Sequence, residues 1–141
     1  MGESNANEKR ILVVEDEQVI SRVCMRVLSA EGFEVDIAIN GQIAKDMVSK
    51  KGYALCLIDI RTPVMNGMEL YQCLKEEHPE LASGVLFTSG DVLSGSTAAF
   101  LREANRPYLR KPFTPDELRT AVREALKQKI LATSGEEIAR R

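Results

Sequence analysis

The sequence has no long apolar segment. None of its apolar runs approaches the ~20 residues that a helix needs to cross a bilayer. The polar start, residues 1–10, has no apolar core of the kind found in signal peptides. These absences argue against membrane-spanning and exported classes, and they predict a protein that stays in the cytoplasm and binds no membrane.

Cysteine and histidine are scarce. The three cysteines, Cys24, Cys56 and Cys73, lie in apolar contexts and show no paired C-x-x-C spacing. Reduced, buried thiols are therefore favoured over a disulfide or a zinc site. The single histidine, His78, sits in the loop-like stretch EEHPE, and we interpret it as a surface residue rather than a ligand.

Neither sign of charge is in excess, because 19 Lys and Arg face 21 Asp and Glu, for a formal net charge of −2. Such a chain has no general attraction to nucleic acid or anionic lipid, which predicts no direct DNA binding. With 141 residues, 44% of them apolar, the chain has the length and composition of one globular domain.

Apolar segments of two kinds alternate along the chain. The short apolar runs predict five strands, at residues 9–15, 33–39, 53–59, 84–89 and 107–110. Segments with helical spacing predict helices at residues 19–32, 41–52, 67–79 and 114–128, with a weaker candidate at 90–105. Thr114 and Glu117 have the spacing of a capping box that starts the last helix.

Strands that are almost entirely apolar and alternate with helices are typical of a parallel sheet covered on both faces. We assign residues 9–128 to one such domain, after a polar leader at residues 1–8. Residues 129–141 are too short for a second domain and form a tail. This tail either extends the last helix or frays, with Ser134 and Gly135 as the expected break.

Polar residues follow the predicted strands. Glu15 and Asp16 end the first strand, Asp59 ends the third and Thr88 the fourth, while Lys111 follows the fifth. Since the carboxyl ends of parallel strands meet at one edge, where such sheets bind ligands, we expect these side chains to converge.

Carboxylates brought together in this way repel one another unless a cation offsets them. Glu15, Asp16 and Asp59 offer the oxygen ligands that Mg²⁺ prefers. Lys111 and Thr88 add a cation and a hydroxyl donor suited to a phosphoryl group. An aspartate can itself accept phosphate as an acyl phosphate, so phosphoryl transfer to Asp59 is the leading hypothesis.

The motifs at the strand ends occur in a familiar order. They are the acidic pair, DIRTPVMNG after the third strand, TSG after the fourth and YLRKPF after the fifth. Together they strongly resemble the receiver domain of bacterial two-component response regulators, over residues 9–128. The resemblance implies a flavodoxin-like, doubly wound five-stranded parallel sheet of order 2-1-3-4-5 with five helices.

The resemblance also implies roles for individual residues. Asp59 is similar to the phosphorylated aspartate, and Glu15 and Asp16 to the acidic pair that holds Mg²⁺, or Mn²⁺ in its place. The backbone carbonyl of Arg61 is then a further metal ligand. The phosphodonor implied is a histidine kinase or a histidine phosphotransfer domain.

Four more residues match the family pattern. Thr88 resembles the switch hydroxyl, Lys111 the lysine that pairs with the phosphoryl group, and Tyr108 the aromatic that changes rotamer on activation. Pro112 resembles the proline of a cis Lys-Pro bond, which costs only ~0.5 to 1 kcal/mol. Phosphorylation is then expected to switch the surface that binds a downstream protein partner, with a homodimer left open.

The sequence departs from the family in three places. Thr62 stands where the family most often has Met, which predicts a local packing change. Arg61 and Gly90 occupy the two positions that vary in the family and flank its phosphoryl group. Arg61 is expected either to contact the phosphoryl group or to point to solvent, and Gly90 offers no side-chain shield, which predicts fast hydrolysis. Residues 90–107 are poor helix material, so the fourth helix is expected to be short or irregular, and the partner surface beside it is in doubt.

Two other functions remain open at this point. One is a magnesium-dependent phosphatase or phosphotransferase that passes through an aspartyl phosphate, although no insertion large enough for a substrate lid is found. The other is a pseudo-receiver that binds partners without phosphorylation. The segment after the fourth strand is also reminiscent of receivers at the end of hybrid histidine kinases, whereas Met1 and the polar leader favour a free-standing protein.

Overall fold

The computed structural model describes residues 8–90 and 95–140, with side chains as far as residue 129. In this part of the chain, parallel strands form one sheet in the order β2-β1-β3-β4-β5. The strands are β1 (Arg10–Val14), β2 (Glu34–Ala38), β3 (Leu55–Asp59), β4 (Val85–Ser89) and β5 (Tyr108–Arg110). The predicted α/β class and strand order are confirmed.

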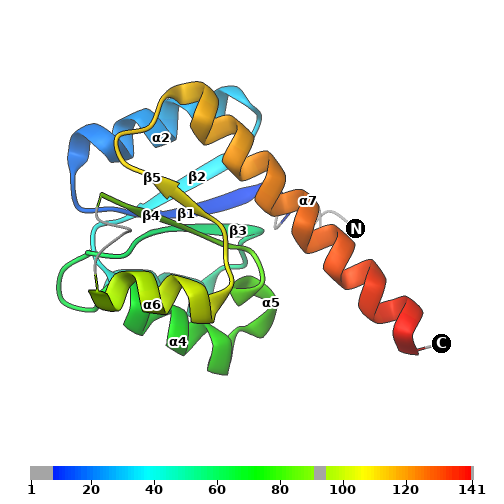
Figure 1. Cartoon of the computed structure of the whole chain (residues 1–141). Helices are drawn as coiled ribbons and strands as arrows, with labels where there is room; N and C mark the ends of the chain where they lie inside the picture. Colours follow the sequence, from blue (N-terminus) through cyan, green and yellow to red (C-terminus); the bar gives the residue numbers. More distant parts are fainter. Residues whose placement is uncertain (1–7, 91–94, 141) are drawn as a thin grey trace.

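Helices cover both faces of the sheet (Figure 1). They are α2 (Gln18–Ala30), α3 (Gly41–Lys50), α4 (Gly67–Glu77), α5 (Pro79–Ala82), α6 (Gly95–Ala104) and α7 (Pro115–Arg140). Buried residues of α2 and α7 pack on one face, and those of α3, α4, α5 and α6 pack on the other. The sheet is therefore the middle of three layers.

The strands are apolar because each side of the sheet meets a helix. In β1, Leu12 and Val14 face the core that contains α4, while Ile11 and Val13 face the core under α2 and α7. All four are at most 1% exposed. Alternation of side chains across a strand thus produces two apolar faces, and the sequence reads as a continuous apolar run.

Three of the seven aromatic residues form a cluster between α6 and the sheet. Tyr71 of α4, Phe87 of β4 and Phe100 of α6 form three edge-to-face pairs, with ring centroids 5.3, 5.9 and 5.3 Å apart. Such pairs add to the area that the rings bury. This cluster attaches α6 to the sheet, although the sequence of α6 is a weak helix former.

The helices differ from expectation in three ways. Within the described residues, α6 is a regular helix of 10 residues. The short helix α5 is not among the predicted helices, because the sequence pattern predicts that the third helix ends at residue 79. Pro79 instead occupies the first turn of α5, a position that proline tolerates. The break expected at Ser134 and Gly135 is absent, since α7 continues to Arg140; a single glycine costs a helix only about 1 kcal/mol.

Parts of three predicted segments lie outside the described residues. These are residues 1–7 of the leader, residues 91–94 before α6, and residue 141 of the tail. Among the helices that the structure describes, none is long and apolar enough to cross a membrane.

Candidate functional site

Three polar side chains are buried where neighbouring strands end. Asp59 is the last residue of β3 and is 5% exposed; Glu15 directly follows β1 and is 3% exposed. Thr88, 2% exposed, lies opposite Asp59 in the register of β3 and β4. The parallel sheet thus brings together residues that are up to 73 positions apart in the sequence, from Glu15 to Thr88.

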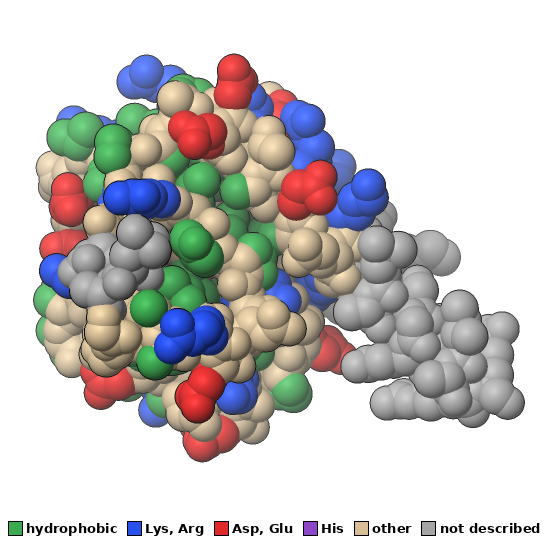
Figure 2. Space-filling view, in the orientation of Figure 1, with side chains coloured by type: hydrophobic (Ala, Val, Ile, Leu, Met, Phe, Trp, Pro, Cys, Tyr) green, Lys and Arg blue, Asp and Glu red, His purple; other side chains and the backbone are tan. Residues whose placement is uncertain are grey.

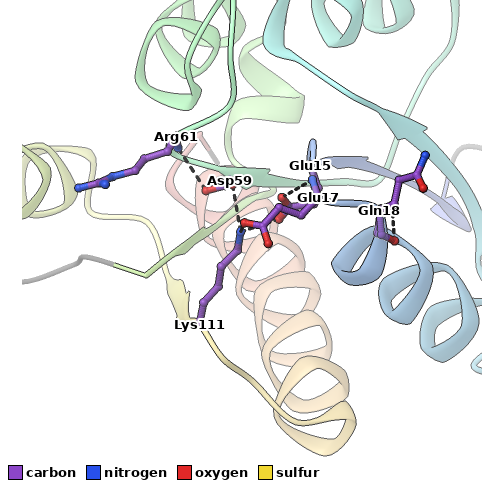
Figure 3. A network of polar contacts seen from close by, with 7 residues as sticks. Glu15, Glu17, Gln18, Asp59, Arg61 and Lys111 are labelled. Atoms are coloured by element: carbon purple, nitrogen blue, oxygen red, sulfur yellow. Dashed lines mark hydrogen bonds and ion pairs between the residues drawn. The ribbon is translucent and has the colours of Figure 1, made fainter.

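Lys111 closes this edge from β5. Its backbone N–H donates to the carbonyl of Ser89 at 2.9 Å, and its bond to Pro112 is cis. Figure 3 shows the side chain pointing into the carboxylate group. The ammonium lies 2.7 Å from Glu15 Oε1 and 3.0 Å from Asp59 Oδ2. One cation therefore bridges two buried carboxylates.

Burial and pairing act against each other on these charges. Burial raises the pKa of Glu15, and the neighbouring Asp59 adds to the rise, while the hydrogen bond from Lys111 opposes it. Burial alone would lower the pKa of Lys111, but its hydrogen bonds to Glu15 and Asp59 outweigh burial and raise it. The ammonium is held in its charged form by the carboxylates that it pairs.

The same edge can supply a metal ion with oxygen ligands. Glu15, the exposed Asp16 and Asp59 each offer a carboxylate oxygen, and these oxygens lie within 4.8 Å of one another. Two of the three carboxylates are buried. This donor set is all oxygen, so it fits Mg²⁺ or Mn²⁺ better than zinc or copper.

The loop after β3 presents its backbone to Asp59. The N–H of Arg61 donates to Asp59 Oδ1 at 3.2 Å, while the guanidinium of Arg61 points away from Asp59 (Figure 3). Thr62 is 3% exposed, and its hydroxyl donates to the carbonyl of Met65 at 3.1 Å. Thr62 therefore links two residues of the loop by a hydrogen bond that a methionine side chain could not donate.

Tight backbone packing at the end of this loop requires a glycine. A Cβ on Gly67 would lie 2.7 Å from the carbonyl oxygen of Asp59 and 2.8 Å from Cα of Ile60. Within the loop, Val64 has a φ of 67°, although it is β-branched and 80% exposed. The loop after the phosphoacceptor candidate is therefore closely packed at Gly67 and exposed at Val64.

The remaining predicted residues surround this centre. Tyr108 begins β5, pairs with Phe87 in register and is 49% exposed. Gly90 is exposed, and a Cβ placed on it would meet no atom of the described residues within 4 Å. Fast hydrolysis at this site stays a prediction.

Sequence reasoning missed Glu17. Its backbone N–H donates to Glu15 Oε2 at 3.1 Å, and its own Oε1 lies 3.8 Å from the ammonium of Lys111. The available signal was the third acidic residue in the run Glu-Asp-Glu directly before a helix. Neither Glu15 nor Asp16 caps α2, whose N-cap is Glu17 without a side-chain hydrogen bond.

An apolar groove of about 320 Å³ adjoins Lys111. Val19, Ile20 and Val23 of α2 line one side, and Pro112 and Phe113 line the other. Val19 is 76% exposed. Figure 2 shows hydrophobic side chains gathered over the start of α2, at the upper left of the view. The groove offers apolar contact directly beside the charged centre.

Comparison with known proteins agrees with this geometry. A family model for the response regulator receiver domain matches residues 11–123. The transcriptional regulatory protein YkoG of Bacillus subtilis, itself described as uncharacterized, is 35% identical over 118 residues, which are 84% of this chain and 51% of YkoG. PcoR of Escherichia coli, also a transcriptional regulatory protein, is 32% identical over 120 residues, 85% of this chain and 52% of PcoR.

The chain spans about half the length of these curated relatives. Among solved structures, a CheY-like response regulator receiver domain protein from Methanospirillum hungatei JF-1 matches with a TM-score of 0.79 and 28% identity. That match covers 88% of this chain and 98% of the other. The chain belongs to the family of response regulator receiver domains, which serve two-component systems.

Proposed function

We propose that the chain is a phosphoacceptor module, in which Asp59 takes a phosphoryl group from a phosphohistidine. The observation that carries this proposal is the bridge from Lys111 to Asp59 and Glu15, at 3.0 and 2.7 Å, inside a cluster of three carboxylates. A buried carboxylate next to a fixed ammonium is suited to hold the charge of a phosphoryl group.

The transfer needs one bond to form and one to break. A carboxylate oxygen of Asp59 attacks phosphorus, the P–N bond of the donor breaks, and the imidazole nitrogen keeps the electron pair. Lys111 then pairs with a phosphoryl oxygen, because the reacting carboxylate gives up its charge to the acyl phosphate. The backbone N–H of Arg61, now on Asp59 Oδ1, steadies the carboxylate during attack.

A divalent ion supports the same step. Glu15, Asp16 and Asp59 would hold Mg²⁺ or Mn²⁺, with the backbone carbonyl of Arg61 as a further ligand, and the ion would neutralise phosphoryl oxygens. The ion and Lys111 would together offset the negative charge of the incoming phosphoryl group.

The donor is proposed to be a histidine kinase or a histidine phosphotransfer domain. The apolar groove between α2 and Phe113 supports docking of such a protein, because it lies next to Lys111. Phosphorylation would then draw the hydroxyl of Thr88 to the phosphoryl group and change the rotamer of Tyr108. The altered surface, near α6 and β5, would engage or release a downstream protein.

The proposal is tested with a small phosphodonor. Incubation with Mg²⁺ and acetyl phosphate, followed by intact mass, is expected to show one phosphoryl adduct that Asp59→Asn lacks. The matched control is Asp46→Asn, which alters an exposed aspartate on α3 and should keep the adduct. Chelation of the metal with EDTA should remove the adduct from every variant.

The same experiment separates the alternatives. Turnover of small phosphate esters by the protein would favour a phosphatase or phosphotransferase. Absence of an adduct with every donor and metal would favour a receiver that binds partners without phosphorylation.

A further inference from the structure

The carboxylate of Glu17 is directed to Lys111 and not to the free N–H groups at the start of its own helix, α2. It is the N-cap residue of α2, with φ −81° and ψ 112°, yet its side chain makes no capping hydrogen bond. Figure 3 shows the carboxylate turned to Lys111, where Oε1 lies 3.8 Å from the ammonium. The side chain is 63% exposed, so molecules in solution that approach Lys111 can reach it.

Glutamate is a poor choice for capping this helix. Ser, Thr, Asp and Asn are preferred at an N-cap because their short side chains reach the free N–H groups. This chain uses such residues elsewhere: Asn40 caps α3, and Asn66 and Thr114 form capping boxes at α4 and α7. At α2 the longer side chain instead reaches Lys111.

The charge count gives Glu17 a distinct part in the site. Three carboxylates, those of Glu15, Asp16 and Asp59, face the ammonium of Lys111. With a divalent ion bound, the positive charges would equal those three negative charges, and the carboxylate of Glu17 would remain in excess. The guanidinium of Arg61 points away from Asp59 and does not lie beside Glu17 (Figure 3). Among these described groups, an approaching anion therefore meets one uncompensated negative charge, at Glu17.

We propose that Glu17 is a specificity-determining residue that slows the capture of small anionic phosphodonors by Asp59. This inference rests on the proposed function. Acetyl phosphate is a dianion near neutral pH, and it is too small to gain contacts outside the phosphoryl site that would offset the repulsion. A protein donor also gains apolar contact in the groove that Glu17 and Val19 border. The same repulsion is therefore a smaller fraction of its total binding free energy, and its rate of transfer to Asp59 falls less.

The test compares donors of different charge at saturating Mg²⁺. Acetyl phosphate carries two negative charges at neutral pH, whereas phosphoramidate carries one. In Glu17→Gln the rate of adduct formation with acetyl phosphate should rise about two- to fivefold at low salt. The rise with phosphoramidate should be smaller, and both should shrink at high ionic strength.

Two further variants separate charge from helix capping. Glu17→Ser and Glu17→Asp both place a good N-cap on α2, but only Glu17→Asp keeps the negative charge. The serine variant should react with acetyl phosphate like Glu17→Gln, and the aspartate variant should stay nearer the wild type. Glu124→Gln, at an exposed position on α7, is the control for net charge and should leave both rates unchanged.

Several results would overturn the inference. Equal acceleration with both donors, acceleration in Glu124→Gln, or equal rates in Glu17→Ser and Glu17→Asp would each contradict it. An adduct on the wild type with no change in any Glu17 variant would remove this inference and leave the proposed function intact. Failure of the wild type to form an adduct would remove both.

Discussion

Two partly buried lysines lie at opposite edges of the same sheet, and their surroundings differ. Lys111, at the carboxyl edge, donates to the carboxylates of Glu15 and Asp59. Lys129, at the amino edge, donates to the backbone carbonyl of Ala54 at 2.9 Å. The pKa of Lys111 is raised, because pairing outweighs burial, whereas burial lowers the pKa of Lys129 despite attraction from Glu80.

The comparison shows where the fold concentrates its chemistry. At the amino ends of the strands, Lys129 links α7 to Ala54, just before β3, by a hydrogen bond, and burial disfavours its charged form. At the carboxyl edge the lysine belongs to a cluster of carboxylates that repel one another without it. Burial alone therefore does not mark a functional lysine; its partners do.

The largest expected contrast comes from removing each ammonium. In EDTA, Lys111→Met should lower the free energy of unfolding by about 2 kcal/mol, because Glu15 and Asp59 lose their shared cation. Saturating Mg²⁺ should reduce this deficit. Lys129→Met should cost about 1 kcal/mol with or without Mg²⁺. Urea denaturation of the three proteins in both buffers measures these values, and a Mg²⁺-independent deficit in Lys111→Met would contradict the comparison.

Alkaline pH should affect the two lysines in opposite directions. The raised pKa of Lys111 means that its contribution to stability is complete below the ordinary value of 10.5 and is lost as pH rises through the higher folded value. The lowered pKa of Lys129 gives a cost at neutral pH that disappears as pH rises through the folded value toward 10.5.

The measurement is the difference in unfolding free energy between wild type and each methionine variant, in EDTA, from about pH 8 to about pH 11. The advantage of the wild type over Lys111→Met should narrow at the alkaline end. Its stability relative to Lys129→Met should increase instead. If the difference in unfolding free energy changed with pH in the same way for both variants, Lys111 and Lys129 would not have opposite pKa shifts, and the comparison would be wrong.

A side chain at position 90 should increase the half-life of the acyl phosphate. Gly90→Glu places a side chain where a Cβ would meet no atom of the described residues within 4 Å, and it should slow hydrolysis severalfold by obstructing water. Arg61→Ala should have a smaller effect, because the guanidinium points away from Asp59. Intact mass at intervals after removal of the donor gives the half-life. An unchanged half-life in both variants would argue against this prediction.

The smallest contrast concerns two helix starts. Thr114 and Glu117 bond reciprocally at the start of α7, at 3.0 and 3.1 Å, so Thr114→Ala should cost about 1 kcal/mol. Glu17→Ser should add about 0.5 kcal/mol at the start of α2. Thermal unfolding measures both. A loss of stability in Glu17→Ser would mean that Glu17 supports the fold through its contact with Lys111.

Much of this organisation could be predicted from the sequence. The convergence of Glu15, Asp59, Thr88 and Lys111 follows once the apolar runs are read as parallel strands, because the carboxyl ends of parallel strands lie on one side of a sheet. The strand order came from the resemblance to receiver domains and not from the apolar pattern. Thr114 was predicted as a cap because capping is local. The roles of these residues in phosphoryl transfer remain predictions.

Other features depend on tertiary contacts that no local pattern encodes. The orientation of Glu17 follows from the position of Lys111, 94 residues later in the chain. The α6 helix is held by Phe87 and Tyr71 on other elements, and its own composition argues against it. Continuation of α7 through Gly135 likewise overrides a local breaker.

The central claim is that the carboxyl edge delivers Asp59 as the phosphoacceptor. The most direct measurement is intact mass, with peptide mapping after borohydride reduction, of wild type and Asp59→Asn exposed to Mg²⁺ and acetyl phosphate. The expected result is a single phosphoryl adduct on Asp59 in the wild type and no adduct in Asp59→Asn. An adduct of equal yield in Asp59→Asn, or one mapped to another carboxylate, would contradict it.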